Sequence, residues 1–282
     1  MKAPNSFQTQ GQAQSVATRS SLSHNINAVL AIAYRDFLKI LRDPARLVGL
    51  LVFPLIYIGF IGGGMQSAFG ERIGYSYLPF VFTGVLAQTL FQAGVLEIVS
   101  LLEDRETDFS QEIFVSPISR YAIILGKVVG GALAALPQGV GVFLFSVMVL
   151  RVGVSLPQAL EIAFLGLVVA LYGGSFGMLI LGLLPNRGAA NRIFPFVLLP
   201  QFFTAGVFAP IENLPLPLHI ISLISPMRYA VDLMRHCFFW GSPQYDQVVL
   251  QTPLLNAAVL SVTFLAFSVL GTLLFVRSER NR

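Results

Sequence analysis

Six long apolar segments dominate the sequence, and only short polar stretches separate them. A helix needs roughly 20 apolar residues to cross a hydrocarbon core of about 30 Å. The segments that meet this requirement lie at about 47–64, 77–102, 121–150, 159–184, 193–210 and 252–276. Of the 282 residues 55% are hydrophobic and only 11% are charged, too little charge to keep such a chain soluble. The predicted fold is an all-α polytopic membrane protein with six transmembrane helices.

Basic residues predict how these helices are oriented, because Lys and Arg concentrate on the cytoplasmic side of a membrane. With a cytosolic N-terminus, the inner segments hold 13 of the 18 Lys and Arg residues and the outer segments hold four; Lys127, just inside the third span, is the remaining one. We therefore expect a multi-pass protein of the cell (inner or plasma) membrane with both termini cytosolic. Residues 1–25 are predicted to be a disordered tail, 44–276 the permease domain and 277–282 a second cytosolic tail.

Residues 26–43 have the periodicity of an amphipathic helix. Arg35, Lys39 and Arg42 recur three or four residues apart, opposite an apolar face. This pattern is typical of a helix in the membrane interface, and the alternative is a cytosolic helix packed on a partner. Small residues at four-residue spacing, such as Gly126 and Gly130, indicate close helix packing elsewhere without naming the partners.

The stretch 103–119, EDRETDFSQEIFVSPIS, carries five acidic residues between the second and third spans. The orientation above places it on the inner face. On the outer side, 211–250 is apolar but interrupted by Pro215, Pro217 and Pro226, which predicts short re-entrant or outer helices before the last span. In that region Arg228, Asp232 and Arg235 are spaced for local ion pairs.

The chain offers little of the chemistry that enzymes need. Gly126-Lys127 lacks the upstream glycine of a nucleotide-binding loop, and the three histidines are too scattered for a catalytic triad. We therefore expect no metal site and no enzymatic activity. We also expect no nucleic-acid binding, because the basic residues form no patch. Glu97 and Lys127 lie at matching depths inside the second and third spans, which predicts an ion pair; a gate or proton relay is the alternative.

This order of elements resembles the type-2 ATP-binding-cassette exporter permeases, which include drug-resistance, polysaccharide and nodulation-factor exporters. The resemblance rests on Glu103 to Thr107, Phe114 to Pro117 and Gly126-Lys127 in the inner region, and on Phe202 to Pro210, Ser225-Pro226 and Tyr229 to Arg235 near the outer side. It extends over about residues 26–276.

The resemblance implies a permease without its own cofactor, paired with a second permease subunit, identical or different. Two separate ATPase subunits would carry ATP and Mg. Helix 26–43 would be the connecting helix, and the 103–119 segment would be the coupling helix. The implied ATPase-coupling residues are Glu103, Asp104, Arg105, Glu106, Asp108, Glu112, Ser116 and Pro117.

The same resemblance implies a path between the two permease subunits, lined by the second and fifth spans. Its wall candidates are Phe91, Phe194, Phe196, Phe202, Phe203 and Phe208. An apolar, aromatic wall would suit export of an amphipathic drug-like molecule, a lipid or a glycan. The alternatives are a gradient-driven secondary transporter and a non-transporting membrane assembly factor.

Overall fold

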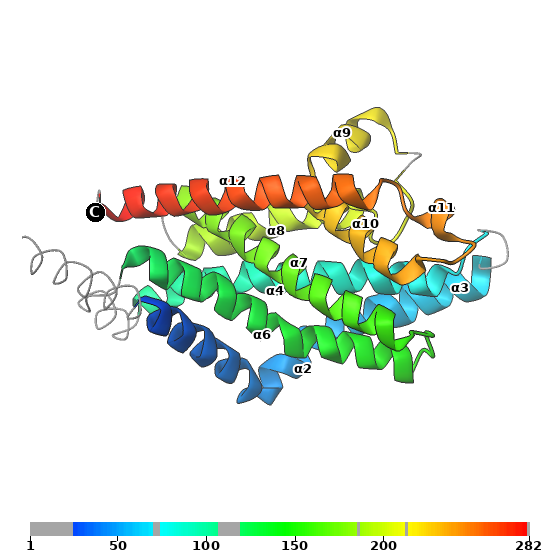
Figure 1. Cartoon of the computed structure of the whole chain (residues 1–282), viewed down its shortest axis with the longest axis horizontal. Coiled ribbons are helices and arrows are strands. Elements are labelled where there is room, and N and C mark those ends of the chain that lie inside the picture. The colour runs from blue at the N-terminus through cyan, green and yellow to red at the C-terminus, as the bar shows by residue number, and fades with distance from the viewer. Residues whose placement is uncertain (1–24, 70–73, 107–118, 185–186, 212–213, 281–282) are drawn as a thin grey trace, which may run out of the picture.

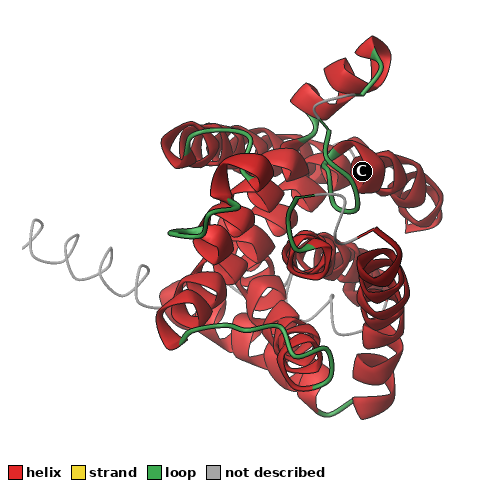
Figure 2. Cartoon of the chain, turned by 90° about the vertical axis from the view of Figure 1, so that its right-hand side faces the viewer, coloured by secondary structure: helices red, strands yellow, loops and turns green. Residues whose placement is uncertain are grey.

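The computed structural model describes residues 25–69, 74–106, 119–184, 187–211 and 214–280, which form an all-helical bundle. The long helices lie side by side along the longest axis of the molecule (Figure 1). Figure 2 looks along that axis and shows helices and loops, with no strand among the described residues. After a first helix over residues 25–41, the elements are α2 (Pro44–Ile56), η1 (Tyr57–Gly63), α3 (Gly64–Phe69), α4 (Tyr77–Glu106), α6 (Arg120–Met148), α7 (Leu156–Leu183), α8 (Arg187–Thr204), α9 (Leu216–Ile224), α10 (Pro226–Phe239), α11 (Tyr245–Val248) and α12 (Pro253–Arg280).

Five helical segments of the described chain are long and apolar enough to cross a membrane, which supports the predicted polytopic class. They are Pro44–Ala68, Tyr77–Ser100, Tyr121–Met148, Leu156–Leu183 and Pro253–Phe275. The start of the first helix and the end of α12 lie at the same end of the bundle, as two termini on one side of a membrane require (Figure 1). The helices α3 and α11 lie at the opposite end (Figure 1).

The segment expected as the fifth span, 193–210, forms only the shorter helix α8. Its apolar part is Arg192–Thr204, below the length of the other five spans. Pro195 and Pro200 each remove an intrahelical hydrogen bond from it. Gly206 then takes a φ of +76°, a left-handed conformation that turns the chain just after the helix ends. The count of six full-length spans is therefore not supported by the described residues.

Helix α4 is the centre of the bundle, and glycines let α7 approach it backbone to backbone. A Cβ on Gly94 would collide with the carbonyl of Ala170, and one on Gly173 would collide with the carbonyl of Phe91. On Gly177 it would lie 3.1 Å from the Cα of Val95. Gly173 and Gly177 of α7 thus allow close packing on α4, as small residues do between helices in lipid.

The first helix packs on α6 of the same chain, again through glycines. A Cβ on Gly126 would lie 3.0 Å from the Cβ of Ile32, and one on Gly130 would lie 3.1 Å from the Cα of Ala33. At the start of both helices, the Ser119 N–H donates to the Asn25 side chain at 3.2 Å. The sequence predicted an amphipathic helix here but not what it packs on. The structure shows that one face of this helix is buried against the bundle.

Between 211 and 250 the chain forms short helices, as the prolines predict. Pro217 lies in the first turn of α9 and Pro226 is the first residue of α10, positions where a missing N–H costs nothing. Helix α9 projects from the side of the bundle (Figure 1). Helix α10, in contrast, packs on α4, α7 and α12.

Candidate functional site

A buried polar cluster joins the first helix, α4 and α6. Lys127 Nζ lies 3.1 Å from Asp36 Oδ2 and 3.9 Å from Glu97 Oε1. It also donates to Ser100 Oγ at 3.3 Å, and Ser100 in turn donates to Glu97 Oε1 at 2.9 Å. The structure thus brings together Glu97 and Lys127, as their matching depths predicted. It also adds a second carboxylate, that of Asp36 on the first helix.

Two arginines extend the cluster toward the edge of the bundle. Arg35 donates to Asp36 Oδ1 at 2.6 Å, and Arg46 Nη2 lies 3.8 Å from Glu97 Oε2. Arg46 belongs to the first turns of α2, so the cluster reaches a fourth helix. Since an isolated buried charge is costly in a membrane, this mutual pairing is what allows the acids and Lys127 to remain buried.

Sequence reasoning missed Asp36, although a signal was present. Ile32, Ala33 and Ile40 are buried at helical spacing, and Asp36 lies on the same face with 1% of its surface exposed. An acidic residue on the apolar side of an amphipathic helix needs a buried partner. The basic residues chosen for this helix behave differently: Arg35 pairs with Asp36, whereas Lys39 and Arg42 are exposed.

The predicted ATPase-coupling residues are not described in side-chain detail. Glu103, Asp104, Arg105 and Glu106 form the last turn of α4, and their side chains lie outside the described residues. The remaining four, Asp108, Glu112, Ser116 and Pro117, fall in the segment 107–118, which also lies outside. What the structure does place is the side chain of Glu97, which precedes Glu103 by less than two turns on the same helix.

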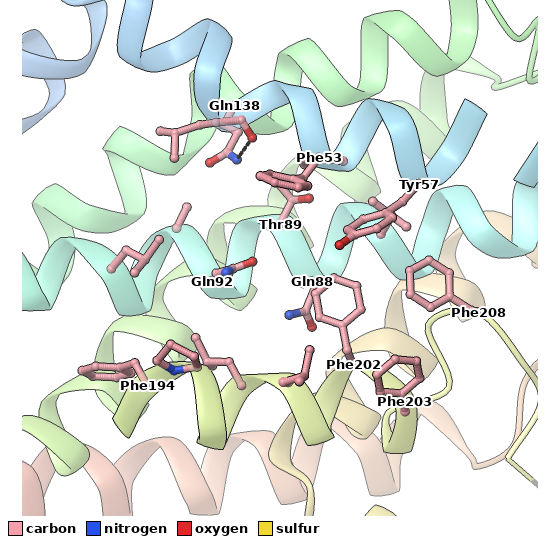
Figure 3. A pocket seen from close by; sticks show the side chains of 18 of the residues that line it. Phe53, Tyr57, Gln88, Thr89, Gln92, Gln138, Phe194, Phe202, Phe203 and Phe208 are labelled. Atoms are coloured by element: carbon pink, nitrogen blue, oxygen red, sulfur yellow. Dashed lines mark hydrogen bonds between the residues drawn. The ribbon is translucent and has the colours of Figure 1, made fainter. Parts of the chain in front are cut away.

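A cleft of about 800 Å³ opens between α2, α4 and α8 (Figure 3). Phe53 and Tyr57 border it on one side, and Phe194 and Phe203 on the other. Gln138 reaches it from α6. Among the described residues that line it, none carries an acidic or basic side chain.

Four of the six phenylalanines proposed for a path wall line this cleft: Phe194, Phe202, Phe203 and Phe208. Phe91 does not, because its ring lies wholly buried between α4 and α7, 5.8 Å from the ring of Tyr172. That prediction was wrong, since an aromatic residue on the α7 face of α4 packs inside the protomer. Phe196 is 82% exposed and is not a lining residue either.

An aromatic cluster lies at one end of the cleft (Figure 3). The Tyr57 ring lies 5.5 Å from the rings of both Phe202 and Phe208, which are 5.4 Å from each other. The Tyr77 hydroxyl donates to the Phe208 carbonyl at 2.7 Å and so ties this part of the chain to α4. Edge and offset ring contacts of this kind make a compact apolar plug.

Amides form the polar part of the cleft. Gln88, Thr89 and Gln92 come from one side of α4, and Figure 3 shows Gln88 and Gln92 directed into the space beside α8. Gln138 Nε2 donates to the Leu50 carbonyl at 2.9 Å. Sequence reasoning missed these residues because it considered charged, aromatic and small residues within the spans but not uncharged polar ones.

The three charged residues of α10 do not pair with one another within the described structure. Asp232 accepts hydrogen bonds from the Leu250 and Gln251 backbone N–H groups at 2.8 and 2.9 Å and from Asn256 at 2.7 Å. Its carboxylate therefore holds the segment that enters α12. The predicted chain of local ion pairs does not form, because Asp232 instead satisfies partly buried backbone donors at the entry of α12.

The two arginines of α10 also find partners outside it. Arg228 donates to Ser222 Oγ at 3.1 Å. Arg235 donates to the Gly206 carbonyl and lies over the Phe80 ring, 3.6 Å from its centroid. Helix α10 thus fastens α4, the turn after α8 and the start of α12 to one another.

Comparison with known proteins agrees with this architecture. The family described as ABC-2 type transporter matches residues 27–239. A protein of Cyanophora paradoxa that bears the name transport permease ycf38 is 25% identical over 258 residues, which cover 89% of this chain and 88% of that protein. Nodulation protein J of Rhizobium meliloti (strain 1021) is 28% identical, covering 71% and 76%. A protein of Escherichia coli (strain K12) named as the multidrug ABC transporter permease YbhR is 26% identical, covering 57% and 44%. The chain therefore belongs to the ABC-2 type transporter family, as a membrane transport subunit.

Proposed function

We propose that this chain is the permease subunit of an ATP-driven exporter in the cell membrane and that separate ATPase subunits power it. The observation that carries the proposal is the family membership of a chain whose 282 residues contain no nucleotide-binding loop. A transport subunit without that loop needs another polypeptide to hydrolyse ATP. We further propose that two permease subunits assemble with two ATPase subunits, with both termini of this chain cytosolic.

The buried polar cluster supports a route from the ATPase to the cleft. The acidic segment 103–119 follows α4, and Glu97 on the same helix contacts Lys127 of α6. Lys127 also contacts Asp36 of the first helix, and Glu97 contacts Arg46 at the start of α2. Because α2 and α4 both line the cleft, a displacement of the end of α4 would act on both of its walls. In this proposal the cluster makes these helices move together.

The test is ATPase coupling with neutralised acids. The chain is purified with its cognate ATPase, and Glu103→Gln, Glu106→Gln and Glu112→Gln are introduced singly and together. We expect the combined variant to lose transport and ATPase stimulation while the permease remains folded. The matched control is Glu161→Gln, which neutralises an exposed acid near the start of α7, expected on the outer side.

Three outcomes would count against the proposal. Full coupling in the combined variant would remove the coupling role from segment 103–119. Transport by the permease alone in ATP-free vesicles, abolished by an ionophore, would favour a gradient-driven transporter. Failure to move any substrate with any co-purified ATPase would favour a membrane assembly factor.

A further inference from the structure

The amide of Gln88 lies in the middle of a membrane span, and no residue of the described structure is hydrogen-bonded to it. Gln88 is 1% exposed, and neither its Nε2 nor its Oε1 is hydrogen-bonded to any described residue. The span of α4 runs from Tyr77 to Ser100, so Gln88 lies near its midpoint. Leaving an amide unpaired at that depth is unfavourable, because no lipid group there can replace the missing hydrogen bonds.

The surroundings of this amide are a cleft, not a packed core. Gln88 lines the 800 Å³ cleft together with Thr89 and Gln92, and Gln92 lies one helical turn away on the same face. The rest of the wall is mostly aromatic and aliphatic. A cleft of this size and composition, apolar with a few convergent polar groups, is typical of a small-molecule site.

We infer that the cleft binds an uncharged amphipathic molecule. Its amide or hydroxyl group accepts a hydrogen bond from Gln88 and donates one to it, and its apolar part lies against Phe53, Phe194 and Phe203. A ligand amide or hydroxyl offers a donor and an acceptor side by side, and these match the two unpaired atoms of Gln88. The inference deepens the proposed function, on which it rests in treating the cleft as part of the export path.

The same geometry excludes charged ligands. None of the described residues that line the cleft is acidic or basic, and the Asp36–Lys127–Glu97 cluster already pairs its charges internally. An ionised head group at the level of Gln88 would therefore lose its hydration without gaining a counter-ion. The uncharged wall of the cleft therefore selects uncharged ligands, whatever the shape of their apolar part.

Contact with the ligand requires a change of side-chain rotamer. Both amide atoms of Gln88 are shielded in the structure although the side chain is directed toward α8, so the amide must turn about its last torsion to contact a ligand in the cleft. The last torsion of glutamine is soft, which makes this movement inexpensive. On binding, the unpaired amide of Gln88 gains a hydrogen-bond partner from the ligand. This gain favours a hydrogen-bonding ligand over a purely apolar one.

The binding test needs neither ATPase nor nucleotide. The full chain is placed in phosphatidylcholine nanodiscs and exposed to three photoreactive probes with the same twelve-carbon chain: a primary amide, an ammonium and a carboxylate. We expect the amide to label the cleft saturably and the two charged probes to label it more than about tenfold less. Gln88→Leu should weaken labelling by the amide about three- to tenfold, the effect of losing one or two hydrogen bonds.

Gln201→Leu is the matched control. Gln201 also has a buried and unpartnered Oε1, but it is not a lining residue of the cleft. We expect this variant to bind the amide probe as the unaltered chain does. We also expect Gln88→Leu to unfold at the same temperature as the unaltered chain or at a higher one, because it removes an unpaired buried amide.

Each contrary result overturns the inference. Lower thermal stability of Gln88→Leu would mean that Gln88 has a structural partner, and a changed oligomeric state would mean that a second copy of the chain supplies it. Equal labelling by all three probes, or labelling unaffected by Gln88→Leu, would mean that ordinary lipid chains fill the cleft. The proposed function fails independently, by a lack of ATP-driven transport in a chain that still shows Gln88-dependent binding.

Discussion

Gln138 Nε2 donates a 2.9 Å hydrogen bond to the carbonyl oxygen of Leu50, which lies four residues before Pro54. Because proline has no N–H, Pro54 cannot make the helical bond that this carbonyl would otherwise accept. The amide of α6 takes its place and joins α6 to α2 at the cleft. Directly after this region, the helix widens into the π-helix η1. A side chain from another helix thus compensates for a proline inside a membrane span.

Gln138→Leu should therefore destabilise the protein by about 1–3 kcal/mol, the cost of a buried carbonyl left without a donor. The measurement is unfolding in mixed micelles. Pro54→Ala restores the missing N–H. Gln138→Leu should therefore cost less stability when it is added to Pro54→Ala than when it is introduced into the unaltered chain. Strictly additive effects of the two substitutions would contradict this relationship.

Lys127→Met should destabilise the protein by about 3–5 kcal/mol, because it leaves Asp36 and Glu97 buried without their shared cation. The triple variant Asp36→Asn, Glu97→Gln, Lys127→Met removes all three charges and should regain much of that loss. Unfolding transitions of the two variants provide the comparison. If Lys127→Met alone had no effect, the cluster would not hold the first helix on the bundle.

Gly94→Ala should disrupt the contact between α4 and α7. Its methyl group would meet the backbone carbonyl of Ala170, which cannot yield unless the two helices separate. We expect a loss of at least about 2 kcal/mol, in the range of overpacked cores. Gly63→Ala is the control, since a Cβ there would have no described atom within 4 Å. Equal thermal stability of the two variants would argue against backbone contact at Gly94.

Asp232→Ala should loosen the entry into α12, because three donors, one buried and two partly buried, would lose their acceptor. A destabilisation of about 2–4 kcal/mol is expected. Asp232→Asn keeps one side-chain oxygen and should fall between Asp232→Ala and the unaltered chain. Hydrogen exchange at the Leu250 and Gln251 amides measures the local effect. The exposed acid Asp246, changed to Ala, should leave this exchange rate unchanged.

The sequence alone determined the class of the fold and several of its local features. Long apolar runs predict membrane helices because a bilayer accepts little else, and prolines at 215, 217 and 226 predict the helix breaks of the outer region. The pairing of Glu97 with Lys127 was predicted from their similar depth in the membrane, since two opposite charges at the same depth have few other partners. The first two are properties of single segments, which composition reports directly, and the third needs only the depths of two spans that follow each other in the chain.

The tertiary structure decided which segments meet. Asp36 joins Lys127 across about ninety residues of sequence, and the carboxylate of Asp232 accepts its hydrogen bonds from the entry of α12. Phe91 packs into α7, whereas Gln88, three residues earlier, lines the cleft with an unpaired amide. Residues three apart lie on roughly the same helix face, so helical periodicity does not separate them, and what each one meets depends on how distant helices pack. That packing is a collective outcome of all the contacts, so no single stretch of sequence contains it.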